Sequence, residues 1–169
     1  MRWNEIGDTE CSIARALAVV GDRWTLLVLR EAFTGVRRFD DLQANTGMSR
    51  HLLADRLRSL TDEGVLRRVR YQERPERFEY RLTEAGLDLY PVIVGLLAWG
   101  DRWAPRDSGP SVILEHMGCE QLIHPALVCP ECGERVGARD VRMHLVEPSH
   151  PRYDTAAHHE FRAKFAQRL

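Results

Sequence analysis

The sequence predicts a mainly α-helical fold with a small β component, and three observations lead to this prediction. Apolar residues recur at helical spacing through most of the first 103 positions. Two short segments near position 70 instead alternate apolar and polar residues around an arginine-rich loop, as in a β-hairpin. A segment with three cysteines and short apolar runs follows a linker at 105–111. We therefore expect a helical domain over 1–104, a small β-ribbon module over 112–147 and a tail over 148–169.

The segment 48–60 predicts the helix around which the rest of the chain is organised. Ser49 is a suitable N-cap, because its hydroxyl can accept a hydrogen bond from a free amide of the first turn. Three leucines recur at i, i+4 and i+7 and so share one face: Leu53, Leu57 and Leu60. The opposite face is polar, with His51, Asp55 and Arg58. Taken alone, this stretch also fits an ordinary amphipathic surface helix.

Three helices are predicted before this one, over 11–20, 24–32 and 39–44. Asp22 is the expected N-cap of the second helix, which is apolar on most sides and suits the centre of a core. The third helix carries acidic residues in its first turn, where they complement the helix dipole. A short helix, a turn containing Gly47 and a longer helix follow one another in the order of a helix-turn-helix motif.

A β-hairpin is predicted directly after the candidate recognition helix 48–60. Gly64 ends that helix, and strands over 65–71 and 78–82 flank the polar loop 72–77. A hairpin in this position is a wing. Positions 50–81 hold nine arginines and six acidic residues, a net charge of +3, whereas the whole chain carries −1. The positive charge is therefore concentrated where a winged helix-turn-helix would contact DNA.

A further apolar helix is predicted from Thr83, its cap, to about Trp103, with a kink at Pro91. Its apolar residues exceed what one side of a small domain can bury. We expect it to pack against its copy in a second subunit, together with the first helix, because DNA readers of this size use two half-sites. Burial of the helix within its own domain is the alternative.

The residues of 11–103 resemble the HxlR family of bacterial winged-helix, MarR-like transcriptional regulators. The segments that carry the resemblance are Cys11-Ser-Ile-Ala-Arg15, Gly21-Asp-Arg-Trp-Thr25, Leu29-Arg-Glu31, Arg37-Arg-Phe39, Ser49-Arg50, Leu52-Leu53, Arg56-Leu57, Tyr71-Gln-Glu-Arg-Pro75 and Glu79-Tyr-Arg-Leu-Thr83. The resemblance implies a homodimer on operator DNA, with dimer contacts from the N-terminal and post-wing helices. Cys11 matches the cysteine through which some members sense oxidants, which makes it a redox-sensing candidate; a packing role is the alternative.

The predicted DNA contacts come from the recognition helix, the wing and the loop before the helix-turn-helix. They are Arg38, Ser49, Arg50, His51, Ala54, Arg58, Arg74 and Arg77. The four residues at positions 49–51 and 54 are expected nearest the base edges of a palindromic operator, and Arg58 on a phosphate. Arg74 and Arg77 are expected on the DNA backbone or in the minor groove.

The C-terminal module carries a second chemical signal. Cys129-Pro-Glu-Cys132-Gly133 has the spacing of a metal-binding turn, and a structural zinc site needs four nitrogen or sulfur ligands. Cys119, Cys129 and Cys132 supply three, and His116 or His124 the fourth, with His116 preferred. Short strands are expected at 112–114, 127–128 and 141–143. A Cys129–Cys132 disulfide and free thiols in a module without metal are the alternatives.

Composition predicts a soluble protein, the lack of targeting segments together with the metal-type cysteine spacing predicts the cytoplasm, and the lack of catalytic motifs predicts that it is not an enzyme. The 169 residues are 44% hydrophobic and 29% charged, without a bilayer-spanning apolar run or a signal-peptide core. There is no phosphate loop, nucleophile elbow or zinc-protease motif. A small zinc-dependent enzyme using the cysteine and histidine residues is the alternative. The sequence does not identify the signal that the regulator senses, which could be redox state, a metal or a small molecule. A short helix is expected over 158–169.

Overall fold

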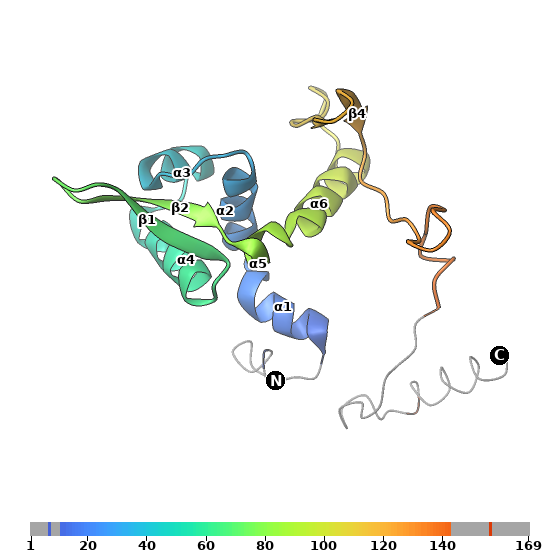
Figure 1. The fold of residues 1–169 in the computed structure, drawn as a ribbon, viewed down its shortest axis with the longest axis horizontal. Coiled ribbons are helices and arrows are strands. Elements are labelled where there is room, and N and C mark those ends of the chain that lie inside the picture. Colours follow the sequence, from blue (N-terminus) through green and yellow to red (C-terminus); the bar gives the residue numbers. More distant parts are fainter. Residues whose placement is uncertain (1–6, 8–10, 143–155, 157–169) are drawn as a thin grey trace. The chain divides into compact units, whose positions relative to one another are not determined.

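The computed structural model describes residues 7, 11–142 and 156 (Figure 1). The chain divides into two compact units. The smaller unit contains α1 (Ser12–Val20), and Asp22–Gly137 form the larger one. The elements of the larger unit are α2 (Arg23–Phe33), α3 (Phe39–Thr46), α4 (Arg50–Asp62), β1 (Leu66–Gln72), β2 (Arg77–Leu82), α5 (Glu84–Leu87), α6 (Tyr90–Trp103), β3 (Leu114–His116) and β4 (Gln121–Ile123). The predicted fold class, mainly α with a small β component, is confirmed.

The core of the larger unit is built around α2, which contacts α3, α4, α6 and β2. This central position agrees with the apolar character predicted for 24–32. The buried side chains come from four helices, the turn before α4 and the start of β1: Val28, Leu29, Leu42, Met48, Leu53, Leu57, Leu60, Val65, Leu66 and Val94. The three leucines predicted to share one face of the recognition helix are all in this set.

The ends of the helices follow the predicted local chemistry. The Asp22 carboxylate accepts from the amides of Trp24 at 2.9 Å and Thr25 at 3.3 Å, and so caps α2. The Ser49 hydroxyl accepts from the amide of Leu52 at 3.3 Å and caps α4. Gly47, with φ +69°, ends α3 in the left-handed conformation that only glycine adopts without a steric cost. Gly47 and Ser49 together define the sharp turn between α3 and α4.

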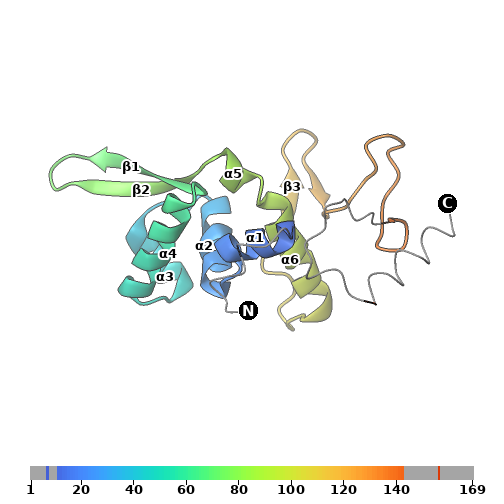
Figure 2. The same ribbon diagram turned by 90° about the horizontal axis from the view of Figure 1, so that it is seen from below.

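Strands β1 and β2 form the predicted antiparallel hairpin, with Leu66 opposite Leu82. Figures 1 and 2 show its tip extending beyond the neighbouring helices. The backbone before α3 adds to this sheet, because Arg38 bridges Glu79 and the Tyr80 amide donates to the Arg37 carbonyl at 2.8 Å. The hairpin is therefore anchored to the helix-turn-helix along β2 and exposed at its tip, as a wing is.

The prediction of one kinked helix from Thr83 to Trp103 is wrong. The segment forms two helices, the short α5 and then α6, with Pro91 in the first turn of α6. A proline in that position loses nothing, because the first amides of a helix have no partner within the helix. Pro91 therefore helps to begin a helix here and does not bend one.

The strands predicted in the C-terminal module are only partly correct. The first lies at Leu114–His116, two residues later than expected, and pairs with β4, which was not predicted. Val128 forms an isolated bridge with Arg135, and 141–142 form no strand. Met143, the last residue of that predicted strand, and the helix predicted over 158–169 lie outside the described residues. Across the described ranges, no helix is long and apolar enough to cross a membrane.

Candidate nucleic-acid interface

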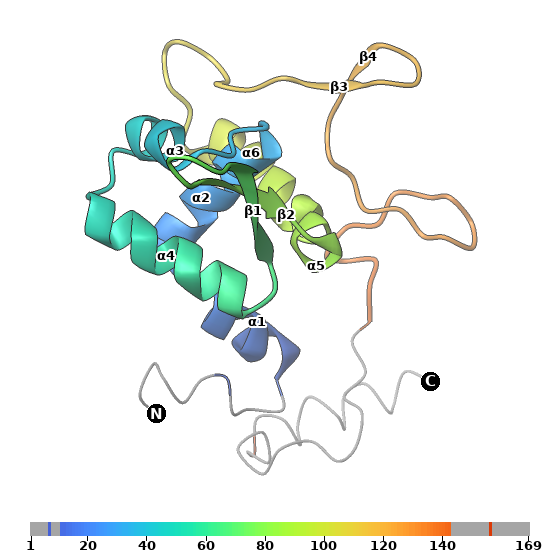
Figure 3. The same cartoon turned by 60° about the vertical axis from the view of Figure 1, so that its left-hand side comes forward.

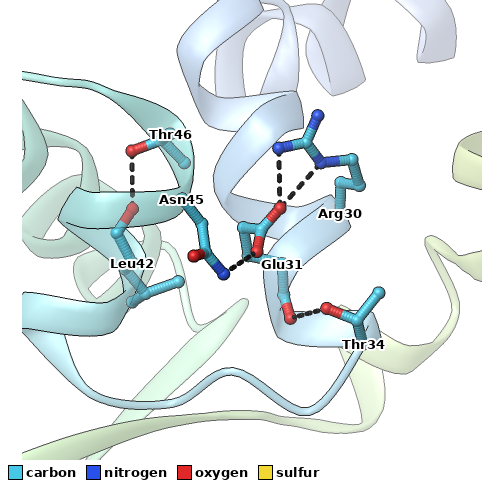
Figure 4. A network of polar contacts seen from close by, with 6 residues as sticks. All are labelled: Arg30, Glu31, Thr34, Leu42, Asn45 and Thr46. Carbon is cyan, nitrogen blue, oxygen red and sulfur yellow. Dashed lines mark hydrogen bonds and ion pairs between the residues drawn. The ribbon is translucent and has the colours of Figure 1, made fainter. Parts of the chain in front are cut away.

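A network of polar contacts fixes α3 against α2 (Figure 4). The Glu31 side chain, from α2, is buried with 7% of the residue exposed. Its carboxylate accepts from Asn45 Nδ2 of α3 at 2.6 Å and from Arg30 Nε at 2.8 Å. The Thr34 hydroxyl donates to the Glu31 carbonyl at 2.8 Å, at the end of α2. This network sets the orientation of α3, from which the chain turns directly into α4.

Figure 3 shows α4 at the outer edge of its unit, with α3 above it and β1 to its right. Ser49, Arg50 and His51 are exposed at its N-terminal end, and Ala54 is half-buried one turn later. Arg50 Nη1 lies 3.0 Å from Asp40 Oδ1, and the Arg50 side chain is 68% exposed. Predicted base-reading residues are therefore gathered at one accessible helix end.

Sequence reasoning missed the residues that orient these side chains. Gln43 Oε1 accepts from Arg50 Nη1 at 3.2 Å, and the Arg50 guanidinium lies 4.8 Å from the centre of the Phe39 ring. Asp55 pairs with two predicted contacts, His51 at 3.3 Å and Arg58 at 3.4 Å. The spacing of Asp55 from His51 and Arg58, four and three residues, could have predicted these two pairs. The partners of Arg50 lie in α3, and no pattern in the sequence around Arg50 could have indicated these contacts.

The wing carries the remaining predicted arginines. Arg74 and Arg77 are exposed at its tip, where the Arg74–Pro75 peptide is cis and Gln72 Nε2 donates to the Arg74 carbonyl at 3.1 Å. Within the described part of the chain, no ion pair engages either of these two guanidinium groups. Arg38 lies beside the middle of the wing, where it bridges Glu79, and its guanidinium is 4.9 Å from the centre of the Tyr71 ring.

The predicted metal ligands fall into two pairs. His116 Nδ1 lies 3.2 Å from Cys119 Sγ. Hydrogen bonds from the backbone of Cys132, then Glu131, and from the Cys132 side chain lower the pKa of the Cys129 thiol. His124 instead lines an open pocket beside α6. Among the described residues, no three such side chains already meet around a metal position.

Cys11, the predicted redox-sensing residue, occupies the N-cap position of α1 and is half-buried. Its backbone carbonyl accepts the first hydrogen bond of the helix, from the Arg15 amide at 3.0 Å. Nothing in this geometry tests the sensing role, which stays a prediction.

The helix-turn-helix followed by an anchored, basic wing defines the class of winged helix-turn-helix DNA-binding proteins. Within that class, the chain matches the HxlR-like helix-turn-helix family over residues 19–108, and it belongs to this family. The resemblance found in the sequence is confirmed, and with it the assignment as a helix-turn-helix transcriptional regulator.

Individual relatives support the same assignment. The uncharacterized HTH-type transcriptional regulator Rv3095 of Mycobacterium tuberculosis is 53% identical over 130 residues, which are 77% of this chain and 82% of that one. Among solved structures, PA1607, named as a transcription factor, has 32% identity and a TM-score of 0.72 over 82% of this chain and 96% of that chain. The redox regulator HypR, in its reduced form, has 27% identity and a TM-score of 0.52 over 58% of this chain and 96% of that chain.

Proposed function

We propose that the protein binds a palindromic operator as a homodimer and regulates transcription from it. Each α4 enters a major groove with Ser49, Arg50, His51 and Ala54 toward the bases, while Arg58 contacts a phosphate. Arg38, Arg74 and Arg77 contact the DNA backbone or the minor groove beside it. Phosphate contacts set the affinity, and the few base contacts set the sequence preference.

The observation that carries the proposal is the accessible state of Arg50 at the N-terminal end of α4. Its partners Asp40 and Gln43 are side chains of α3 that hold the guanidinium at the surface without burying it. An exposed ion pair contributes at most about 1 kcal/mol, so a guanine edge can displace Asp40 at little cost. Arg50 is therefore held ready for a bidentate base contact.

The experiment measures binding to DNA from the region upstream of the protein's own coding sequence and to a random duplex of equal length. Arg50→Ala should weaken operator binding by about 1–3 kcal/mol, the value of one base contact, and random-duplex binding by less. Arg106→Ala, at an exposed linker position, is the matched control and should change neither affinity. Equal losses on both duplexes would remove Arg50 from the base-reading set.

Dimerisation is proposed through the exposed face of α6. Four apolar side chains at i, i+4, i+7 and i+11 lie in contact with solvent: Val92, Leu96, Trp99 and Trp103. Trp99 and Trp103 are 63% and 64% exposed. Monomeric proteins seldom expose a continuous apolar patch of this kind, and two-fold pairing on it would supply the two half-site readers of a palindrome. α1 carries a second exposed pair, Ile13 and Leu17.

Redox sensing by Cys11 is supported by the similarity to HypR, whose name describes it as a redox regulator. The test treats wild type and Cys11→Ser with hydrogen peroxide and measures operator binding before and after a reductant is added. Reversible loss in wild type alone would support sensing, and equal responses would exclude Cys11 as the sensor.

A further inference from the structure

Two turns in the C-terminal module share a backbone hydrogen bond and a positive φ at the same position. In His116–Glu120, the Glu120 amide donates to the His116 carbonyl at 2.8 Å; in Cys129–Gly133, the Gly133 amide donates to the Cys129 carbonyl at 2.8 Å. The fifth residue of each turn has a positive φ, 56° at Glu120 and 73° at Gly133. The first and fourth positions of both turns carry metal-binding side chains, His116 with Cys119 and Cys129 with Cys132.

The first turn keeps this geometry although its sequence does not favour it. Glu120 is a non-glycine residue in the left-handed region, the only one with a positive φ in the described part of the chain. Such a residue persists where its surroundings impose the conformation, and these positions gather at functional sites. The equivalent position of the second turn is a glycine, Gly133, which adopts the conformation freely.

Each turn closes a short β-ribbon, which holds its two side chains at a tip. The first connects β3 and β4, with His116 paired with Gln121. The second is closed by the Val128–Arg135 bridge and by the Cys129 amide, which donates to the Glu134 carbonyl at 2.9 Å. A pair of ligands at the tip of a hairpin is half of a four-ligand structural zinc site.

The module buries few apolar side chains of its own. Met117 is 94% exposed and Leu127 is 75% exposed, and Ile113, Leu122 and Val128 are exposed as well. Segments of this length do not build a sufficient hydrophobic core, and a bound metal is one of the usual substitutes for it.

We propose that His116, Cys119, Cys129 and Cys132 together bind one zinc ion, which joins the two turns. Binding releases three thiol protons to solvent as three zinc–sulfur bonds form, and His116 donates a nitrogen lone pair. All four positions of a tetrahedral ion are then filled by the protein, so the role is structural and not catalytic. The proposal is independent of the DNA-binding one.

The two turns must approach each other on binding, since no three of these side chains already meet among the described residues. Nine residues, 120–128, join Cys119 to Cys129. An extended chain of that length spans about 30 Å, so the connection is long enough to fold back and place four ligands around one ion. Metal binding of this kind is coupled to folding.

His116, and not His124, is the fourth ligand. The His116 Nδ1 atom already faces the Cys119 sulfur at 3.2 Å. The His124 side chain lines the open pocket with Leu97 and Ala98 of α6 and belongs to neither turn.

The test uses the full-length protein, purified without chelator. Elemental analysis should find one zinc per chain, and thiol titration should find the three module thiols slow to react until a chelator removes the ion. Cobalt substituted for zinc should give the absorption bands of a tetrahedral thiolate site. Less than one-fifth of a zinc per chain after refolding with added zinc, or a Cys129–Cys132 disulfide in freshly purified protein, would overturn the proposal.

Substitutions of the individual ligands test which four side chains bind the zinc ion. Cys119→Ser, Cys132→Ser and His116→Ala should each lower zinc content or raise its dissociation rate at least tenfold. Cys11→Ser and His124→Ala are the matched controls and should keep one zinc per chain. Full zinc retention by His116→Ala with loss in His124→Ala would overturn the assigned ligand set. Circular dichroism of the helical part checks that each variant is folded.

Discussion

The orientation of the recognition helix depends on one buried carboxylate. Glu31 receives hydrogen bonds from Asn45 of α3 and from its neighbour Arg30, at the point where α2 and α3 meet (Figure 4). The Arg30 contact is partly exposed and adds little, since water competes for it. The Asn45 contact joins two helices, so it is the one that transmits the position of α2 to α3 and then to α4.

Glu31→Ala should therefore lower the free energy of unfolding by about 1–3 kcal/mol, because the hydrogen bond that Asn45 donates to the buried Glu31 carboxylate is lost. Urea unfolding followed by circular dichroism measures this. Asp41→Ala, at an exposed position of α3, is the control and should change the stability by less than about 0.5 kcal/mol. Equal stability of the two variants would show that the network is not what holds α3.

At the scale of elements, local chemistry in the sequence predicted most of the helix-turn-helix and wing. Asp22 and Ser49 act as caps because a side-chain oxygen near free amides needs no distant partner. Prediction failed where distant contacts decide. The Pro91 position fits both a kink and a helix start, and only the break after α5 distinguishes them. Likewise, Asp40 and Gln43 hold Arg50 across a turn, which no periodicity reveals.

The C-terminal module was harder to predict, for a different physical reason. Its strands are three residues long and mostly exposed, so no alternation of apolar and polar residues marks them. What the sequence did mark was the spacing of its ligand-type residues. The pairs at 116/119 and 129/132 lie in turns of matching geometry, although their strand boundaries were misplaced.

The wing should act on DNA through charge alone. Arg74 is exposed at the tip, and no described ion pair engages it, so its removal costs the free protein little. Arg74→Ala should reduce the slope of log affinity against log salt by about 0.9, the value of one phosphate contact. Fluorescence anisotropy at several salt concentrations measures the slope, with Arg106→Ala as control. An unchanged slope would place Arg74 off the phosphates.

At the scale of the whole molecule, DNA recognition and self-association place different demands on the surface. A single winged helix-turn-helix covers too few base pairs for useful selectivity, because each base pair contributes about 1–3 kcal/mol of discrimination. Two copies related by a two-fold axis read twice as many. The basic residues of α4 and the wing and the apolar stripe of α6 are separate surfaces, so one can be changed without the other.

Trp99→Glu tests this separation. Because Trp99 is 63% exposed, a glutamate there should leave the fold of the chain intact, yet a charge at the centre of an apolar interface would have to be buried without a partner. Sedimentation equilibrium should give the mass of one chain for the variant and of two for wild type. Operator affinity should fall at least tenfold, while random-duplex binding per chain changes less.

Val141→Glu, at a similarly exposed apolar residue outside α6, is the control and should keep the wild-type mass. A dimeric Trp99→Glu variant would move the interface to another surface, with Ile13 and Leu17 of α1 as the next residues to change.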